Sequence, residues 1–354
     1  MKDSPYLQNG PLCPLPLAHN EQIVIGHGSG GKMTHDLITK LFAPYLNSPA
    51  LQQGNDFAGL TLPQGGRLAV STDSHIVKPL FFPGGDIGRL AVCGTVNDIS
   101  MSGGIPLYLT AGFILEEGLP MATLQAVLAS MQAAAEEAGV QFVAGDTKVV
   151  EKGKGDGLFI NTAGIGWIPE GRKVGGALAQ PGDAVLISGT IGEHGVAVLA
   201  ARGELGFETG VQSDAAPLNG LIQAVLQAAP HTHVLRDPTR GGLATTLNEI
   251  AQQSRANILI DETAIPIQPA VRSVCEMLGF DPLYVANEGK VIVIVAAEEA
   301  EAALAAMRAQ PYGQNAARIG RVEAAPAGRV LLKTPIGGTR ILDMLAGEML
   351  PRIC

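Results

Sequence analysis

The 354-residue sequence contains few aromatic and few charged residues. Phe, Trp and Tyr together make up 4% of the chain, and Asp, Glu, Lys and Arg make up 16%. The net charge is −9, and no cluster of lysine and arginine supplies the basic surface that would neutralise a nucleic-acid backbone. We therefore expect no nucleic-acid partner.

The sequence also lacks a long apolar run and closely spaced cysteines. No stretch of about 18 apolar residues is present, and the first residues lack the apolar core of a signal peptide. The cysteines form no CxxC pair, which argues against a zinc site or a redox pair. These absences predict a cytoplasmic protein with no membrane association and with free thiols. The cysteines are Cys13, Cys93, Cys275 and Cys354.

Hydrophobic residues, at 46%, and 45 glycines favour well-buried α/β domains with many tight turns. The length suits two domains of ordinary size. Strand-like and helix-like segments alternate in both halves. We expect an irregular leader over 1–20, an N-terminal domain over 21–168, a C-terminal domain over 169–334 and a mobile tail over 335–354.

Individual elements follow from apolar periodicity and turn residues. Gly139 fits the C-terminal cap of an alanine-rich helix, and Gly145-Asp146-Thr147-Lys148 is expected at the end of a strand. The last strands are expected to form a terminal hairpin over 320–334. Among the other predicted elements are strands over 22–25, 67–73 and 140–144 and helices over 33–45, 88–101 and 121–138.

A glycine-rich segment, 26–32, follows the first predicted strand. Consecutive glycines let backbone N–H groups converge on phosphate oxygens, and a lysine adds positive charge. The candidate nucleotide-binding residues are Gly28, Gly30, Gly31 and Lys32. The segment is not a Walker A loop, because Met33 follows the lysine where Ser or Thr is required. A surface turn remains the alternative.

Aspartates stand at the expected ends of strands or helices. Mg²⁺ prefers oxygen ligands and is usually held by a few carboxylates together with nucleotide phosphates. Each aspartate alone is more often a cap or turn residue, and His75, beside one of them, is more often structural. Four aspartates that each lie close to Gly, Ser, Thr or Asn in the sequence indicate a metal or nucleotide site. These residues are Asp73, Asp98, Asp146 and Asp237.

The chain ends in a cysteine, Cys354. Chain ends are usually exposed, so packing does not explain this residue. A prenylation signal requires its cysteine four positions from the end, which excludes that lipid anchor. A thiol that carries a group between partners is one interpretation, and a chance exposed thiol is the other.

Several strings together resemble a known superfamily. Four short motifs occur in the order found in the ATP-using aminoimidazole ribonucleotide synthetase and selenophosphate synthetase enzymes. They are Ser71-Thr72-Asp73-Ser74, Val96-Asn97-Asp98-Ile99, Gly145-Asp146-Thr147-Lys148 and the segment 236–242. Ala286-Asn287-Glu288-Gly289 and the ending Pro351-Arg352-Ile353-Cys354 resemble the HypE family of hydrogenase-maturation carbamoyl dehydratases. The resemblance covers about 21–354. It implies a two-domain α/β fold with mixed sheets.

The resemblance implies a reaction on a thiol. A partner carbamoyltransferase loads a carbamoyl group onto Cys354, and ATP with Mg²⁺ converts it to a thiocyanate. The cyanide then passes to iron on a hydrogenase-maturation scaffold for the Fe(CN)2CO centre. A homodimer through the N-terminal domains is also implied.

The chemistry suggests residue roles within that resemblance. Phosphorylation turns the amide oxygen into a leaving group, and a base must remove protons from nitrogen. Glu288 is the candidate base, with a surface acid at the start of a strand as the alternative. Lys148 is the candidate for neutralising the oxygen that is phosphorylated or for holding the γ-phosphate, with a solvated lysine as the alternative. Asn97 and Asp146 would support the nucleotide. The resemblance assigns the metal to Asp73, Asp98 and Asp237.

Two other functions remain open at this stage. One is an ATP-dependent ligase or kinase of the same fold that acts on a free small molecule. The other is a non-catalytic carrier whose tail transfers a group between partners. Gly337-Gly338 is the expected pivot of the tail. Cys13 is a rival thiol, although it lies well before the glycine-rich segment.

Overall fold

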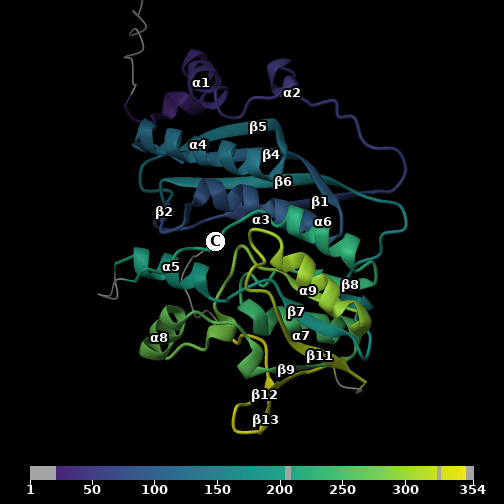
Figure 1. The fold of residues 1–354 in the computed structure, drawn as a ribbon. Helices are drawn as coiled ribbons and strands as arrows, with labels where there is room; N and C mark the ends of the chain where they lie inside the picture. Colours follow the sequence, from purple (N-terminus) through teal and green to yellow (C-terminus); the bar gives the residue numbers. More distant parts are fainter. Residues whose placement is uncertain (1–20, 204–208, 325–327, 348–354) are drawn as a thin grey trace, which may run out of the picture.

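The structure, a computed structural model, describes residues 21–203, 209–324 and 328–347. It contains two main β-sheets with helices packed against them (Figure 1). The four-stranded sheet belongs to the N-terminal half and the seven-stranded sheet to the C-terminal half. The fold is therefore mixed α/β with two domains. No helix in these ranges has both the length and the apolar composition needed to cross a bilayer.

The N-terminal sheet has the strand order β1-β6-β4-β5, in which only β4 and β5 run parallel. The helices α3 and α4 cover one face, here called the inner face, and bury its apolar side chains. Leu68, Val70 and Ile114 remain exposed on the outer face. The elements are β1 (Arg67–His75), α3 (Ile87–Met101), β4 (Ile105–Glu116), α4 (Met121–Ala138), β5 (Gln141–Val150) and β6 (Leu158–Ile168).

Glycines allow α3 to lie close against the inner face. A Cβ on Gly166 would stand 2.3 Å from Ile99 Cγ2, and one on Gly164 would stand 2.8 Å from Thr95 Cγ2. Side chains at these β6 positions would push the helix away from the sheet. The close approach places Asp98 of α3 beside β1, where Ser71 Oγ donates a 2.7 Å hydrogen bond to Asp98 Oδ2.

The C-terminal sheet has the order β13-β12-β9-β11-β7-β10-β8. Helix α7 packs on one face of the central strands, and α6 with α9 packs on the other. Strands β7 and β10 are buried along their whole length because both faces are covered. The elements are β7 (Ala184–Ile187), α5 (Glu193–Ala201), α6 (Asn219–Ala228), β8 (Thr232–Arg236), α7 (Gly242–Ser254), β9 (Asn257–Asp261), α8 (Pro269–Leu278), β10 (Ile292–Val295), α9 (Ala300–Arg308), β11 (Ala317–Glu323), β12 (Val330–Lys333) and β13 (Thr339–Leu342).

Short elements complete the N-terminal half. In Figure 1, α1 and α2 lie beyond the β5 edge of the sheet, at the opposite end of the molecule from β13. These elements are a 3-10 helix (Ile25–Gly28), α1 (Lys32–Leu37), a π-helical segment (Ile38–Phe42), α2 (Pro49–Gln52), β2 (Phe81–Phe82) and β3 (Gly85–Asp86).

Three local predictions are wrong. The expected strand over 22–25 is reduced to a single bridge at Gln22, because the 3-10 helix begins at Ile25. The string 145–148 lies within β5 instead of at its end, since β5 stays paired with β4 up to Val150. The expected hairpin over 320–334 does not form, because β11 and β12 pair with opposite sides of β9.

The segment expected as a tail begins with an ordered strand. Gly337 and Gly338 form the turn between β12 and β13, where Thr334 N donates to Gly338 O at 2.8 Å. They are therefore part of a hairpin and not the expected pivot. Beyond β13 the chain follows α7: Tyr284 Oη donates to Asp343 O at 2.9 Å, and Leu345 N donates to Thr245 Oγ1 at 3.4 Å.

Candidate active site

Four carboxyl groups from both domains interact at the junction between the two sheets. Asp73 is on β1, Asp98 on α3, Asp237 follows β8 and Glu288 precedes β10. Burial and the neighbouring charge of Asp73 raise the pKa of Asp98. Burial and the charge of Asp98 raise the pKa of Asp237 to about 7. The fold thus places the three predicted metal ligands and the predicted base within electrostatic range of one another.

Glu288 is the buried carboxyl group from the C-terminal domain that precedes β10. Its side chain is buried, and burial raises its pKa well above the ordinary value. The charges of Asp214, Asp237, Asp73 and Asp98 act in the same direction. A carboxyl group with a raised pKa is a stronger base once it is ionised, which suits proton abstraction from an amide.

Asp73 and His75 lie side by side on the inner face of β1. His75 Nε2 is 3.6 Å from Asp73 Oδ2, and a Cβ on Gly94 of α3 would stand 3.1 Å from the His75 ring. Burial lowers the pKa of His75, Asp73 raises it and Arg240 lowers it, with a net decrease. Neither ring nitrogen has a hydrogen-bond partner within the described ranges. His75 is therefore a neutral side chain against Asp73.

Asn287 connects the segment 285–291, here called the Glu288 loop, to the segment 237–241, here called the Asp237 loop. Its amide nitrogen donates to Pro238 O at 2.8 Å, and its backbone N–H donates to the same oxygen at 3.2 Å. Its amide oxygen accepts from Gly192 N, directly before α5, at 2.7 Å. These bonds fix the relative positions of two loops that each carry a site carboxyl group.

Asn97 joins the two domains through backbone groups. Its amide nitrogen donates to Ala216 O at 3.0 Å and to Glu288 O at 3.2 Å, and its oxygen accepts from Leu218 N at 2.8 Å. These contacts hold the Glu288 loop against α3. A direct contact between Asn97 and a nucleotide stays a prediction.

Asp146 and Lys148 lie apart from the four carboxyl groups. They share the outer face of the N-terminal sheet with Val70 and Ile114, whereas Asp73 is on the inner face. Three strand spacings, about 14 Å, separate β1 from β5. Lys148 Nζ is 2.7 Å from Asp146 Oδ1, and this contact lowers the pKa of Asp146. One chain does not bring all predicted site residues together.

The glycine-rich segment lies beside Asp146 and Lys148. A Cβ on Gly28 would stand 2.7 Å from Val149 N of β5, so this position requires glycine for close approach. Gly30 N donates to Thr34 Oγ1 at 3.0 Å, and Gly31 and Lys32 form the start of α1. The predicted nucleotide residues, apart from Asn97, therefore form a second group at the β5 edge.

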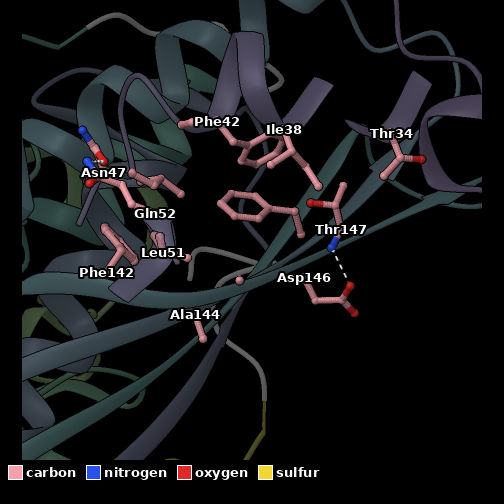
Figure 2. Close-up of a pocket in the computed structure, with 14 residues that line it drawn as sticks. Thr34, Ile38, Phe42, Asn47, Leu51, Gln52, Phe142, Ala144, Asp146 and Thr147 are labelled. Carbon is pink, nitrogen blue, oxygen red and sulfur yellow. Dashed lines mark hydrogen bonds between the residues drawn. The ribbon is translucent and has the colours of Figure 1, made fainter. Parts of the chain in front are cut away.

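A cavity of about 230 Å³ adjoins this second group. Figure 2 shows Ile38 and Phe42 on one side of it and the strand residues Phe142, Asp146 and Thr147 on the other. Its lining is mostly apolar, and Asp146 stands at its edge. Such a lining suits a ligand with a flat, weakly polar part inside the cavity and a polar part at its edge.

The donor set suits a hard divalent cation. The charges of Asp73, Asp98 and Asp237 influence one another, and the pKa values of Asp98 and Asp237 are raised. Mg²⁺ binds through one or two carboxylates plus substrate phosphates, so these oxygens fit such an ion. No three His, Cys, Asp or Glu side chains within the described ranges are already grouped as metal ligands.

Sequence reasoning missed two residues of the site. Asp214 and Lys290 form a buried ion pair beside Glu288, with Lys290 Nζ 3.0 Å from Asp214 Oδ2. The only feature of the sequence that could have indicated Lys290 is its position two residues after the predicted base, Glu288. Cys13 and Cys354 lie outside the described residues.

Comparisons with known proteins identify the family of this chain. The family models for the N-terminal and C-terminal domains of AIR synthase related proteins match residues 54–168 and 180–333. The carbamoyl dehydratase HypE of Cupriavidus necator is 55% identical over 333 residues, which cover 94% of this chain and 95% of the relative.

Two solved structures are also similar. A crystal structure of the hydrogenase maturation protein HypE in complex with ATP has a TM-score of 0.90 at 54% identity, covering 94% of this chain and 99% of that chain. HypE in a crystal structure of a HypE–HypF complex has a TM-score of 0.77 at 51% identity, covering 87% and 99%. The chain belongs to the AIR synthase related family and, within it, to the HypE carbamoyl dehydratases of hydrogenase maturation.

Proposed function

We propose that the protein dehydrates a carbamoyl group carried on the Cys354 sulfur to a thiocyanate at the expense of ATP. The product supplies cyanide for the Fe(CN)2CO centre of a [NiFe] hydrogenase. The observation that carries the proposal is the buried Glu288 within electrostatic range of Asp73, Asp98 and Asp237. Asp237 lies directly before α7, along which the C-terminal segment runs.

The course of the C-terminal segment supports delivery of the thiol. Leu345 N donates a hydrogen bond to Thr245 in the first turn of α7, and that helix begins immediately after the segment 237–241, which contains Asp237. The nine residues 346–354 span at most about 30 Å. A segment of this length that starts beside the first turn of α7 supports delivery of Cys354 towards Asp237, which directly precedes that helix.

The reaction balances with ATP as the only co-substrate. The amide oxygen attacks the γ-phosphorus, and ADP leaves. The C–O bond then breaks with both electrons going to the departing phosphate, while nitrogen loses its two protons and a C≡N bond forms. The carbamoyl oxygen ends in the phosphate product. The carbamoyl group thus loses one oxygen and two hydrogens, the elements of water, but no water molecule is released.

Each site residue has a chemical task in this scheme. Glu288 accepts a proton from nitrogen, and its buried position keeps solvent from competing. Asp73, Asp98 and Asp237 would hold Mg²⁺, which neutralises phosphate charge during transfer. Gly28, Gly30, Gly31 and Lys32 would bind phosphates through N–H groups and charge. Lys148 and Asp146 would act at the same nucleotide from the outer face.

A homodimer accounts for the separation of the two residue groups. Asp146 and Lys148 share the outer face with the exposed apolar residues Leu68, Val70 and Ile114. A second copy covering this face would bury those residues and would contact Asp146 and Lys148. The face is thus a suitable surface for a partner subunit.

The remaining partners follow from the chemistry. A carbamoyltransferase must load Cys354, and the solved HypE–HypF complex supports HypF-like proteins in that role. An iron-carrying maturation scaffold must accept the cyanide. The terminal position of the thiol suits both encounters.

Intact-mass measurement tests the proposed function. The protein is incubated with carbamoyl phosphate, ATP·Mg²⁺ and the carbamoyltransferase, and the adduct is mapped to the C-terminal peptide. We expect a carbamoyl adduct on Cys354 that loses one water only when ATP is hydrolysable. A loaded cysteine that keeps its water would indicate a carrier. ATP turnover that persists in Cys354→Ser would indicate a kinase or ligase of a free small molecule.

A further inference from the structure

A buried ion pair lies directly behind the Glu288 loop. Asp214 belongs to the segment between α5 and α6, and its side chain is 5% exposed; that of Lys290 is 11% exposed. Lys290 Nζ lies 3.0 Å from Asp214 Oδ2. Both residues border a cavity of about 420 Å³ between the domains. Removing two charges from water is costly unless further hydrogen bonds use them.

Asp214 uses both carboxylate oxygens on the loop that carries Glu288. Its Oδ1 accepts from Glu288 N at 3.1 Å, and its Oδ2 accepts from Gly289 N at 3.2 Å. Two consecutive N–H groups are therefore held by one carboxylate, which fixes the orientation of the peptide between them. A Cβ on Gly289 would stand 1.8 Å from Asp214 O, so only glycine allows this approach.

The charge of Asp214 also acts on Glu288. Burial raises the pKa of Asp214, but Lys290 and His194 lower it, and the net direction is down. Asp214 therefore stays ionised beside Glu288, and its charge adds to the effect of burial on the pKa of the Glu288 side chain. One carboxylate thus both orients the loop and sets its electrostatic surroundings.

We infer that Asp214 is a positioning residue for Glu288 and that Lys290 keeps it in place as an anion. The inference rests on the proposed role of Glu288 as the base. A displacement of a reacting group by about 1 Å costs on the order of 100-fold in rate. Loss of the bidentate contact frees the loop to make such a displacement.

The test measures single-turnover dehydration of protein already carrying S-carbamoyl-Cys354, at saturating ATP·Mg²⁺. Asp214→Asn, which keeps one acceptor oxygen, should slow this step about 10- to 100-fold. ATP affinity should change less than about 3-fold, since the Asp214 side chain contacts Glu288 N, Gly289 N and Lys290, none of which is a predicted nucleotide residue. Lys290→Met should behave like Asp214→Asn, and Lys290→Arg should restore most of the rate because it retains the charge.

The exposed ion pair of Asp261 and Lys333, with Nζ and Oδ2 3.1 Å apart, provides a matched control. Asp261→Asn should leave the rate unchanged. If Asp214→Asn does not fold, as judged by circular dichroism, the two Lys290 variants decide the question. A wild-type rate in Lys290→Met, or equal losses in Lys290→Met and Lys290→Arg, would overturn the inference.

A double-variant cycle separates positioning from general destabilisation. If Asp214 acts through Glu288, adding Asp214→Asn to Glu288→Gln should slow the residual reaction no further. An additional loss equal to that of Asp214→Asn alone would contradict the inference. A wild-type rate in Glu288→Gln itself would instead remove the proposed function. An inactive Glu288→Gln with a fully active Asp214→Asn would remove only the positioning role.

Discussion

At the scale of single residues, Glu288 is the side chain on which the proposed chemistry depends. Glu288→Gln keeps the shape of the group but removes the base, so dehydration should slow by about 100-fold or more. Loading of Cys354 and binding of ATP should persist. The measurement is the mass of the C-terminal peptide over time. Water loss at the wild-type rate would show that another group removes the protons.

Asp237 links the site to the pH dependence of stability. Its pKa is about 7 in the folded protein against 3.8 ordinarily, so the folded state binds more protons between these values. The free energy of unfolding should therefore fall as pH rises from about 4 to 7, by up to about 4 kcal/mol from this residue.

Asp237→Asn tests this effect because it cannot ionise. The variant should gain stability relative to wild type as pH rises from 5 to 8, measured by urea unfolding without divalent cations. A wild-type–variant difference that is the same at both pH values would contradict a raised pKa. Added Mg²⁺ and ATP should reduce the difference, since they compensate the ionised carboxylate.

At the scale of elements, the contact between α3 and β6 positions Asp98. Gly166→Val would place a Cβ 2.3 Å from Ile99 Cγ2 and 2.9 Å from Ile105 O. Overpacking of this kind costs about 1–3 kcal/mol, measurable by urea unfolding. Dehydration should slow as well, because α3 carries Asp98. Gly59→Ala, at a position with no atom within 4 Å of the added Cβ, is the control.

Local signals predicted the elements well where pairing is local. The helix over 121–138 is confirmed together with its left-handed cap, Gly139 at φ 70°, because periodicity and the cap are both encoded nearby. The hairpin over 320–334 is wrong because β9, about sixty residues earlier, lies between the two strands. The residues of a strand do not indicate which distant strand it will pair with, so this pairing could not be predicted from the local sequence.

The site was only partly accessible from the sequence for the same reason. Asp73, Asp98, Asp237 and Glu288 were selected by motif, and their meeting depends on how two domains pack. Asp146 and Lys148 were assigned to the same site, but strand alternation puts them on the other face of the sheet. Asp214 was missed because its role lies in contacts with backbone N–H groups, which no motif records.

At the scale of the whole molecule, the exposed apolar residues on the outer face of the N-terminal sheet lead us to expect self-association. Val70 is 71% exposed beside Leu68 and shares its face with Ile114. Wild type should have the mass of a dimer by light scattering, and Val70→Glu should shift it towards the monomer by burying a charge. Ile336→Glu, at a residue 95% exposed in the β12–β13 turn, should leave the mass unchanged. A monomeric wild type would rule out the homodimer.

In the proposed reaction, the hydrogen bond between Leu345 and Thr245 would set a local concentration for the substrate carried on the Cys354 thiol. A group confined within about 30 Å of that point is present at an effective concentration on the order of 10 mM. A free S-carbamoyl peptide would have to reach comparable concentrations to compete. With the substrate carried in this way, the site would need little intrinsic affinity for the carbamoyl group. Selectivity for the substrate would come from the covalent loading step instead.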